Sequence, residues 1–326
     1  MIITKTPFRV SFAGGGSDMA NFYEQHGGCV LSTSINKYCY LSIHPYFDEN
    51  ATLLKYSENE LVTDISKIKH RIFNSVLNEY KVSGVEISST ADVPGGTGLG
   101  SSSTFTVGLL NTIACYRGKF MSKGELAAKA CDVEINKLGS PIGKQDQYAA
   151  AYGGLNFIRF NQDGSVSVEP IVMQPGTYKE LEKHLVMFYT GNTRSANSIL
   201  KEQKKNIDDA AKAENLIWFT EEQQETTATC TQQFTAQRTI LHCDLICFIN
   251  HRIRNTRCQC TFQCPSIIQQ FAKRRKIILF QRALHLFGQM THEPEKQEQL
   301  RVALGLRRFD FSFERDGASV VYIGDR

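Results

Sequence analysis

Residues 94–104 read Pro-Gly-Gly-Thr-Gly-Leu-Gly-Ser-Ser-Ser-Thr, and this run constrains the fold of the chain more than any other stretch. Four glycines in six positions allow the backbone to adopt positive φ angles and to pass close to a ligand. Behind the run, apolar residues recur every fourth position from 105 to 113, which predicts an amphipathic helix that begins near Ser101. Residues 85–88 alternate apolar and polar side chains, which predicts a strand before the run.

The predicted order of strand, glycine-rich loop and helix presents the free N–H groups of the loop at a helix N-terminus. Such a terminus carries unpaired donors and a partial positive charge, and it is therefore a site for a phosphate group. A flexible Gly/Ser linker is the alternative, but a linker does not explain the patterned helix that follows. The run is not a Walker A loop, because Ser101 stands at the lysine position, and it lacks the GxGxxG spacing of dinucleotide folds.

Three stretches together resemble the GHMP kinases, a superfamily named for galactokinase, homoserine kinase, mevalonate kinase and phosphomevalonate kinase. The run PGGTGLGSSS is similar to the second motif of the superfamily. TPFRVSFAGGGSD at residues 6–18 resembles its first motif, and IGKQDQYAAAYGG at residues 142–154 resembles the catalytic-aspartate segment of its sugar kinases. By this resemblance, the residues that bind ATP are Pro94, Gly95, Gly96, Gly98, Leu99, Gly100, Ser101, Ser102 and Ser103.

The first of these stretches predicts a strand at residues 8–12 that leads into three glycines and Asp18. The Asp18 carboxylate can accept hydrogen bonds from sugar hydroxyls, and a tight turn with Asp18 as an Asx cap is the alternative. The resemblance makes Arg9 the basic residue near the transferred phosphate. It also implies a sugar-binding loop formed by Gly15, Gly16, Ser17 and Asp18. Galactokinases have an acidic residue and a histidine in place of Gly15 and Gly16, which favours a different sugar.

Two carboxylates downstream are candidates for chemistry. Ser122 and Glu125 predict a capping box, and the helix that follows places Glu134 beside its apolar stripe. A carboxylate at that position is costly unless it is paired or bound to a metal, and a salt bridge is the alternative. Asp146 begins a helix of small residues after a Gly-Pro-Gly turn, where an isolated aspartate is more often an N-cap.

The resemblance assigns roles to these carboxylates. Asp146 matches the residue that acts as base for, or positions, the acceptor hydroxyl, and Lys144 matches a substrate contact. Ser102 and Glu134 match the ligands of Mg²⁺, a cation that prefers hard oxygen ligands and takes only one or two from the protein. Phosphoryl transfer depends mainly on positioning and charge neutralisation, so no covalent intermediate is required.

The next part of the chain predicts a hairpin with its turn at Asp163 and Gly164, a buried strand at 185–189 and a helix at 195–216. Arg194 lies between that strand and that helix, and it is either a sugar or phosphate contact or an ordinary surface arginine.

Residues 217–294 depart from the superfamily. No glycine occurs between Gly191 and Gly288, although the chain has 24, and the third glycine-rich motif of the superfamily is absent. Six of the ten cysteines lie between residues 230 and 264. A zinc site, formed by Cys243, Cys247, Cys258, Cys260 and Cys264 with His242 and His251, is one explanation, but the spacings are not those of paired C-x2-C motifs. A second explanation is that this stretch contacts nucleic acid or a phosphosugar through its basic clusters at 251–257 and 273–276. A shifted reading frame fits the lost glycines and lost periodicity best.

The fold expected from these patterns is the α+β, two-domain GHMP kinase fold. We expect an N-terminal α/β domain at 1–180 with the phosphate loop and a C-terminal α+β domain at 181–326. With 41% hydrophobic residues the chain can fill such a core, and its net charge of +4 does not indicate nucleic-acid binding. Residues 1–12 show no signal-peptide pattern and no stretch approaches the ~20 apolar residues of a membrane span, so we expect a cytoplasmic protein. The sequence is compatible with a homodimer and does not fix the oligomeric state.

The resemblance is strongest to the bacterial sugar kinases that act on D-glycero-D-manno-heptose 7-phosphate. It implies transfer of phosphate from ATP, with Mg²⁺, to the anomeric hydroxyl of that phosphorylated sugar, a step toward nucleotide-activated heptose. A fucose- or galactose-type kinase is the alternative within the enzymes. A catalytically inactive sugar- or nucleotide-binding homologue is the alternative outside them, because the closing glycine loop is missing.

Overall fold

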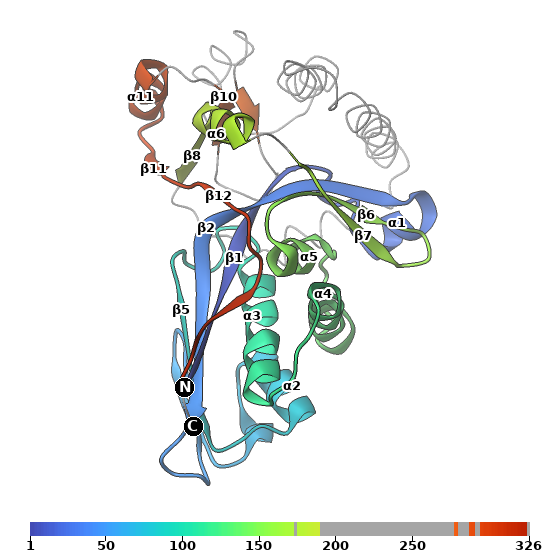
Figure 1. Ribbon diagram of the computed structural model, residues 1–326, viewed down its shortest axis with the longest axis vertical. Helices are drawn as coiled ribbons and strands as arrows, with labels where there is room; N and C mark the ends of the chain where they lie inside the picture. The colour runs from blue at the N-terminus through green and yellow to red at the C-terminus, as the bar shows by residue number, and fades with distance from the viewer. Residues whose placement is uncertain (173–174, 190–276, 280–286, 291–293, 325–326) are drawn as a thin grey trace. The chain divides into compact units, whose positions relative to one another are not determined.

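The computed structural model describes residues 1–172, 175–189, 277–279, 287–290 and 294–324 (Figure 1). The predicted helix at 195–216, Arg194 and the cysteines from 230 to 264 lie outside the described residues. The described residues form two compact units. The first contains Met1–Ile171 and the C-terminal segment from Ser312, and the second contains the described residues between Val172 and Phe311. The division into domains at residues 1–180 and 181–326 stays a prediction.

The first unit is built on a nine-stranded sheet. Its strands are β1 (Ile2–Ala13), β2 (Gly28–Pro45), β3 (Thr52–Lys55), β4 (Asn59–Val62), β5 (Val85–Ala91), β6 (Leu155–Phe160), β7 (Val166–Pro170), β12 (Phe313–Glu314) and β13 (Ser319–Ile323). The main path runs β13-β1-β2-β5-β3-β4, while β6 and β12 also pair with β2 and β7 pairs with β6. Only β3 and β5 are parallel among these described pairs.

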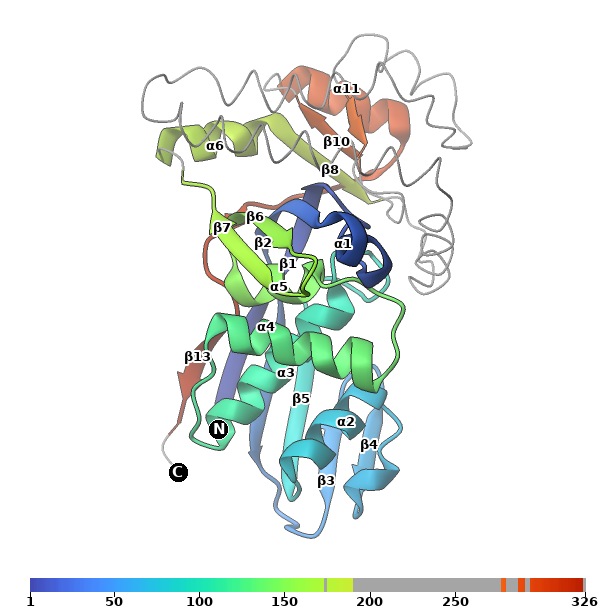
Figure 2. The ribbon, with the colours of Figure 1, turned by 90° about the vertical axis from the view of Figure 1, so that its right-hand side faces the viewer.

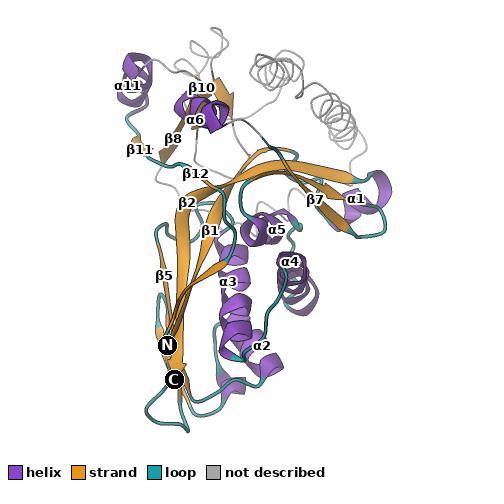
Figure 3. Cartoon of the chain, viewed as in Figure 1, coloured by secondary structure: helices purple, strands orange, loops and turns teal. Residues whose placement is uncertain are grey.

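Strand β2 has different neighbours along its length. Its first part, Gly28–Thr33, pairs with β6, and its last part, Cys39–Pro45, pairs with β5, while β1 runs antiparallel to it on the other edge (Figure 3). The predicted strands at 8–12 and 85–88 are confirmed as parts of β1 and β5. The predicted hairpin is confirmed as β6 and β7, which pair antiparallel from Asn156–Phe160 to Val166–Pro170.

The helices of the first unit lie mainly on one face of this sheet (Figure 2). They are α1 (Ala20–His26), η1 (Ile65–Lys67), α2 (Arg71–Tyr80), α3 (Ser101–Tyr116), α4 (Lys123–Cys131), η2 (Asp132–Lys137) and α5 (Gln145–Tyr152). Helix α3 begins at Ser101, as the pattern predicts. It packs closely on β1 and β2. A Cβ added at Gly108 would lie only 2.8 Å from Leu41 and 2.9 Å from Thr6, so the close approach requires glycine there.

The helix that carries Glu134 changes its winding before it ends. The predicted capping box is confirmed, since Ser122 and Glu125 exchange bonds at the start of α4. The sequence predicts one regular helix that carries Glu134, but residues 132–137 form the wider turn of a π-helix, η2. Such wide turns inside helices frequently occur at functional sites. Here the wider turn carries Glu134, which is buried.

The second unit holds a four-stranded antiparallel sheet in the order β11-β8-β10-β9. Its elements are α6 (Pro175–His184), β8 (Leu185–Tyr189), β9 (Ile277–Leu279), β10 (Phe287–Met290), α11 (Pro294–Leu304) and β11 (Arg307–Phe309). The predicted strand at 185–189 is confirmed as β8, and its three central side chains are buried. Within the anomalous stretch 217–294, the structure describes only 277–279, 287–290 and Pro294, so the explanations offered for that stretch stay hypotheses. In the described part of the chain, no helix has the length and apolar character that a membrane crossing requires.

The Glu60 carboxylate ties β4 to the segment that enters α2. Glu60 is 7% exposed and accepts bonds from the Tyr56 hydroxyl at 2.6 Å and from the N–H groups of Lys69 at 2.7 Å and His70 at 3.0 Å. Burial raises the pKa of Glu60, but these three bonds to the ionised form outweigh it and the net pKa lies below its usual value.

We predict that Glu60→Gln lowers the free energy of unfolding at neutral pH by about 1–3 kcal/mol. The NH₂ group of the glutamine amide would face a hydroxyl or N–H donor that now bonds to a carboxylate oxygen. The ionised Glu60 stabilises the fold above the unfolded-state pKa of about 4.3, and this contribution is lost as pH falls through the lower folded-state pKa. Urea unfolding of both proteins across acidic pH should therefore show a difference that shrinks toward low pH. The exposed Glu58→Gln serves as control and should change stability by less than about 0.5 kcal/mol. A wild-type level of stability in Glu60→Gln would contradict the assignment.

Candidate active site

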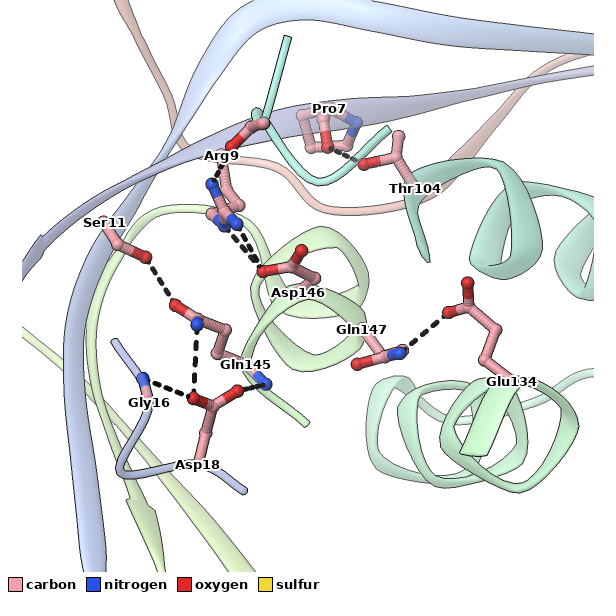
Figure 4. A network of polar contacts seen from close by, with 11 residues as sticks. Pro7, Arg9, Ser11, Gly16, Asp18, Thr104, Glu134, Gln145, Asp146 and Gln147 are labelled. Atoms are coloured by element: carbon pink, nitrogen blue, oxygen red, sulfur yellow. Dashed lines mark hydrogen bonds and ion pairs between the residues drawn. The ribbon is translucent and has the colours of Figure 1, made fainter. Parts of the chain in front are cut away.

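Arg9 joins the glycine-rich loop to Asp146. Its guanidinium donates from Nε to Asp146 Oδ1 at 2.7 Å, with Nη2 2.6 Å from the same oxygen, and from Nη1 to the carbonyl of Gly98 at 2.8 Å (Figure 4). The Arg9 main-chain N–H donates to the Leu99 carbonyl at 3.2 Å. The Arg9 side chain is 6% exposed and that of Asp146 is 24% exposed, so the carboxylate remains within reach of a solute. Strand β1 and the first turn of α5 position these two side chains.

The glycine-rich loop approaches Asp146 directly. Gly96, Gly98 and Gly100 have φ angles of 78°, 64° and 79°, a region that favours glycine. A Cβ added at Gly100 would lie 3.2 Å from the Asp146 carboxylate. Gly100 is also the N-cap of α3, whose first N–H groups, at residues 101–103, have no partner within the helix. The loop therefore brings N–H groups that have no partner within the helix, and the positive end of that helix, next to a carboxylate.

Glu134 bonds to the first turn of α3. It is 1% exposed, and its Oε1 accepts from the Ser102 hydroxyl at 2.6 Å while its Oε2 accepts from Gln147 Nε2 at 2.7 Å. Burial raises the pKa of Glu134, the bonds from Ser102, Ser103 and Gln147 counteract this in part, and the charge of Asp146 raises it further. A cation at this carboxylate would relieve the cost of burying its charge.

The donor set at Ser102 and Glu134 fits Mg²⁺. Both offer hard oxygens, and Ser102 lies at the exposed start of α3 beside the loop that presents free N–H groups. In the described ranges, no group of three or more His, Cys, Asp or Glu side chains is gathered as a self-contained metal site. Mg²⁺ commonly takes one or two protein ligands and completes its shell with waters and substrate phosphates, so the pair is of the expected kind.

Asp18 is held inside the protein. It is 2% exposed, and it accepts from Gly16 N at 2.9 Å, from Gln145 N at 3.0 Å and from Gln145 Nε2 at 3.2 Å (Figure 4). Gln145 Oε1 in turn accepts from the Ser11 hydroxyl at 2.7 Å. Burial raises the pKa of Asp18, these backbone bonds lower it, and the net shift is upward. The carboxylate thus fastens the N-terminus of α5, where Asp146 lies.

The other predicted sugar contacts have partners of their own. The Ser17 hydroxyl is fully buried and donates to the carbonyls of Gly14 and Cys29, both at 2.8 Å. Lys144 Nζ donates to the Gly164 carbonyl at 2.8 Å and lies 4.5 Å from the centre of the Tyr23 ring. Arg194 is outside the described residues, and the sugar-binding roles of Gly15, Gly16, Ser17, Asp18, Lys144 and Arg194 stay predictions.

Sequence reasoning did not assign a role to Ser11, Gln145 or Gln147. The two glutamines directly flank Asp146 in the chain, and each donates to a different buried carboxylate. Their position on either side of the candidate base was the feature of the sequence that could have marked them as part of the site. Helical periodicity alone could not have identified their partners, because those partners lie on other elements.

Gly143 is required by the close approach of Asp18. A Cβ at residue 143 would overlap Asp18 Oδ2 and lie 2.9 Å from the Asp18 carbonyl carbon. We predict that Gly143→Ala lowers the free energy of unfolding by about 1–3 kcal/mol, because neither the bonded carboxylate nor the backbone can move away cheaply. Urea unfolding measures this. Gly176→Ala is the matched control, since nothing lies within 4 Å of its added Cβ, and equal stabilities of the two variants would refute the steric argument.

Known proteins resemble this chain in sequence. Residues 66–154 match the family model described as the GHMP kinases N terminal domain. D-glycero-alpha-D-manno-heptose 7-phosphate kinase of Campylobacter jejuni is 30% identical over 220 residues, which are 64% of this chain and 65% of that protein. The galactokinase of Pyrococcus furiosus is 26% identical over 209 residues, 63% of this chain and 58% of that protein. The chain thus matches slightly less than two thirds of the length of these curated relatives.

Solved structures show the same fold. The crystal structure of a D-glycero-D-manno-heptose 1-phosphate kinase from Bacteroides thetaiotaomicron superposes with a TM-score of 0.73 at 23% identity and covers all of both chains. That of Lactococcus lactis galactokinase complexed with galactose gives 0.62 at 12% identity, covering 99% of this chain and 95% of that one. Residues 66–154 thus match the N-terminal domain of the GHMP kinases, and the chain has the α+β fold of these kinases, as the three motifs predict. Among them, the chain is similar in sequence to a heptose phosphate kinase and also to galactokinases, and these relatives are phosphotransferases.

Proposed function

We propose that the protein is a sugar kinase that transfers the γ-phosphate of ATP to the anomeric hydroxyl of D-glycero-D-manno-heptose 7-phosphate. The contact between Arg9, Asp146 and the glycine-rich loop carries the proposal. It brings a carboxylate and a guanidinium together beside the glycine-rich loop. Phosphoryl transfer needs these groups, because its transition state is loose and is stabilised mainly by positioning and by neutralisation of charge.

Asp146 is the group that receives the proton of the acceptor hydroxyl, late in the transfer. Its carboxylate is partly exposed, while both nitrogens that Arg9 directs at it contact Oδ1. No hydrogen bond to Oδ2 is present among the described residues, so this oxygen can accept from a sugar hydroxyl. The guanidinium fixes the carboxylate and offsets the negative charge that gathers on the transferred phosphoryl group.

The glycine-rich loop holds the phosphates of ATP with the N–H groups of residues 95–103. Ser102 and Glu134 would hold Mg²⁺, which supplies charge neutralisation to the phosphate oxygens when bound. The buried position of Glu134 supports this role, because a carboxylate without a cationic partner among the described residues is costly to keep ionised there.

The sugar is proposed on two grounds. A heptose 7-phosphate kinase is 30% identical to this chain, and Gly15 and Gly16 replace the acidic residue and histidine that galactokinases carry. Galactokinases are nevertheless among the relatives, so a galactose- or fucose-type kinase is the second candidate. A cytoplasmic location and a homodimer stay predictions.

The proposal is tested by ADP release from Mg·ATP with a panel of acceptors: heptose 7-phosphate, mannose phosphates, fucose and galactose. Selective turnover of heptose 7-phosphate is expected. Preferential turnover of galactose or fucose would contradict heptose 7-phosphate as the substrate and support the second candidate. No turnover with retained ATP binding would favour a sugar- or nucleotide-binding protein without catalysis.

We predict that Asp146→Ala lowers kcat by about 10²–10⁴-fold and leaves the affinity for ATP nearly unchanged, because the carboxylate acts on the acceptor hydroxyl. Steady-state kinetics and nucleotide titration measure the two quantities. Asp163→Ala, at the exposed turn between β6 and β7, is the control and should retain wild-type turnover. Turnover by Asp146→Ala at the wild-type rate would remove Asp146 from the mechanism.

A further inference from the structure

Gln147 and Glu134 form a pair that is closed off from solvent. Gln147 is 0% exposed and Glu134 is 1% exposed, and Gln147 Nε2 donates to Glu134 Oε2 at 2.7 Å (Figure 4). The opposite oxygen, Oε1, accepts from the Ser102 hydroxyl at 2.6 Å. The carboxylate on η2 is therefore fixed from two sides, by α5 and by the first turn of α3.

We propose that Gln147 is a positioning residue, which fixes the Glu134 carboxylate so that Oε1 faces Ser102 and the phosphate loop. This inference rests on the proposed function, in which Ser102 and Glu134 hold Mg²⁺. Groups that hydrogen-bond to a ligating carboxylate orient it and tune its affinity for the metal.

The chemistry of the amide suits this role. Lysine or arginine at residue 147 would neutralise Glu134 and weaken its attraction for a cation, whereas an amide donates a hydrogen bond and adds no charge. Nε2 must be the end that faces the carboxylate, because the amide oxygen would meet another acceptor there.

The far end of the same amide argues against a role in packing alone. Gln147 Oε1 is buried and has no hydrogen-bond partner among the described residues. Burying such an oxygen is unfavourable, and an apolar side chain of similar size would avoid the cost. The bond to Glu134 is the contact in the described structure that accounts for an amide at this place.

Each of the three consecutive residues Gln145, Asp146 and Gln147 at the start of α5 has a charged partner on another part of the chain. Gln145 donates to the buried Asp18, Asp146 pairs with Arg9, and Gln147 donates to the buried Glu134. Neutral amides thus hold the two flanking carboxylates, and the guanidinium is directed at the candidate base between them. Of the two, Gln147 contacts the proposed metal ligand.

Calorimetric titration of ATP with and without Mg²⁺ tests the proposal on the full chain. The quantity compared is the enhancement of ATP affinity by Mg²⁺ in the wild type, Gln147→Met, Glu134→Gln and the double variant. Gln147→Met keeps the volume and removes the donor, and we expect it to reduce the enhancement about 10-fold or more while metal-free ATP affinity is retained. Gln297→Met, which also replaces a buried glutamine, is the control and should leave the enhancement unchanged.

The double variant separates positioning from a general structural effect. If Gln147 acts through Glu134, Gln147→Met should have no further effect once Glu134→Gln is present. Additive losses would overturn the inference, as would a wild-type enhancement in Gln147→Met. If Gln147→Met does not fold, Gln147→Asn, whose amide is one methylene too short to reach Glu134, takes its place with the same expectations. A wild-type protein that binds ATP equally well with and without Mg²⁺ would overturn the metal assignment in the proposed function, and this inference with it.

Discussion

The ion pair between Arg9 and Asp146 joins the three parts of the first unit from which the site is made. Arg9 comes from β1, its partner from α5, 137 residues later, and the same guanidinium also bonds to the carbonyl of Gly98. A guanidinium that is almost fully buried must satisfy its donors within the protein, because an unpaired buried charge is strongly destabilising. The bonds that satisfy Arg9 therefore hold the glycine-rich loop and the candidate base in one place.

Charge is distributed unevenly around this pair. Asp18 and Glu134 are both more than nine-tenths buried, and burial raises the pKa of each. Their described bonds come from neutral donors, namely backbone N–H groups, glutamine amides and serine hydroxyls. The arrangement fixes the carboxylates without cancelling their charge. The ionised form of Glu134 is a negative site beside the glycine-rich loop, which is the electrostatic requirement for the divalent cation proposed there.

The elements around the site follow closely from local sequence. The start of α3 at Ser101, the capping box at Ser122 and the β6–β7 hairpin depend on neighbouring residues, and each is confirmed. The wide turn at 132–137 could not be predicted, because its hydrogen-bond pattern is not encoded in the spacing of apolar residues. The burial of Asp18 was also missed. From its own loop it reads as an exposed carboxylate, and its main partner, Gln145, lies 127 residues away.

By itself the sequence determined the glycine-rich loop, the helix behind it and the resemblance to the GHMP kinases, because glycine runs, caps and periodicity act over a few residues. It also singled out Arg9, Asp146, Ser102 and Glu134 by their motifs. Only the tertiary structure decided which groups meet: that Arg9 bonds to both the loop and the candidate base, and that two glutamines hold the buried carboxylates. The physical reason is that hydrogen bonds and ion pairs between distant segments depend on how sheet and helices pack, which short-range patterns do not specify.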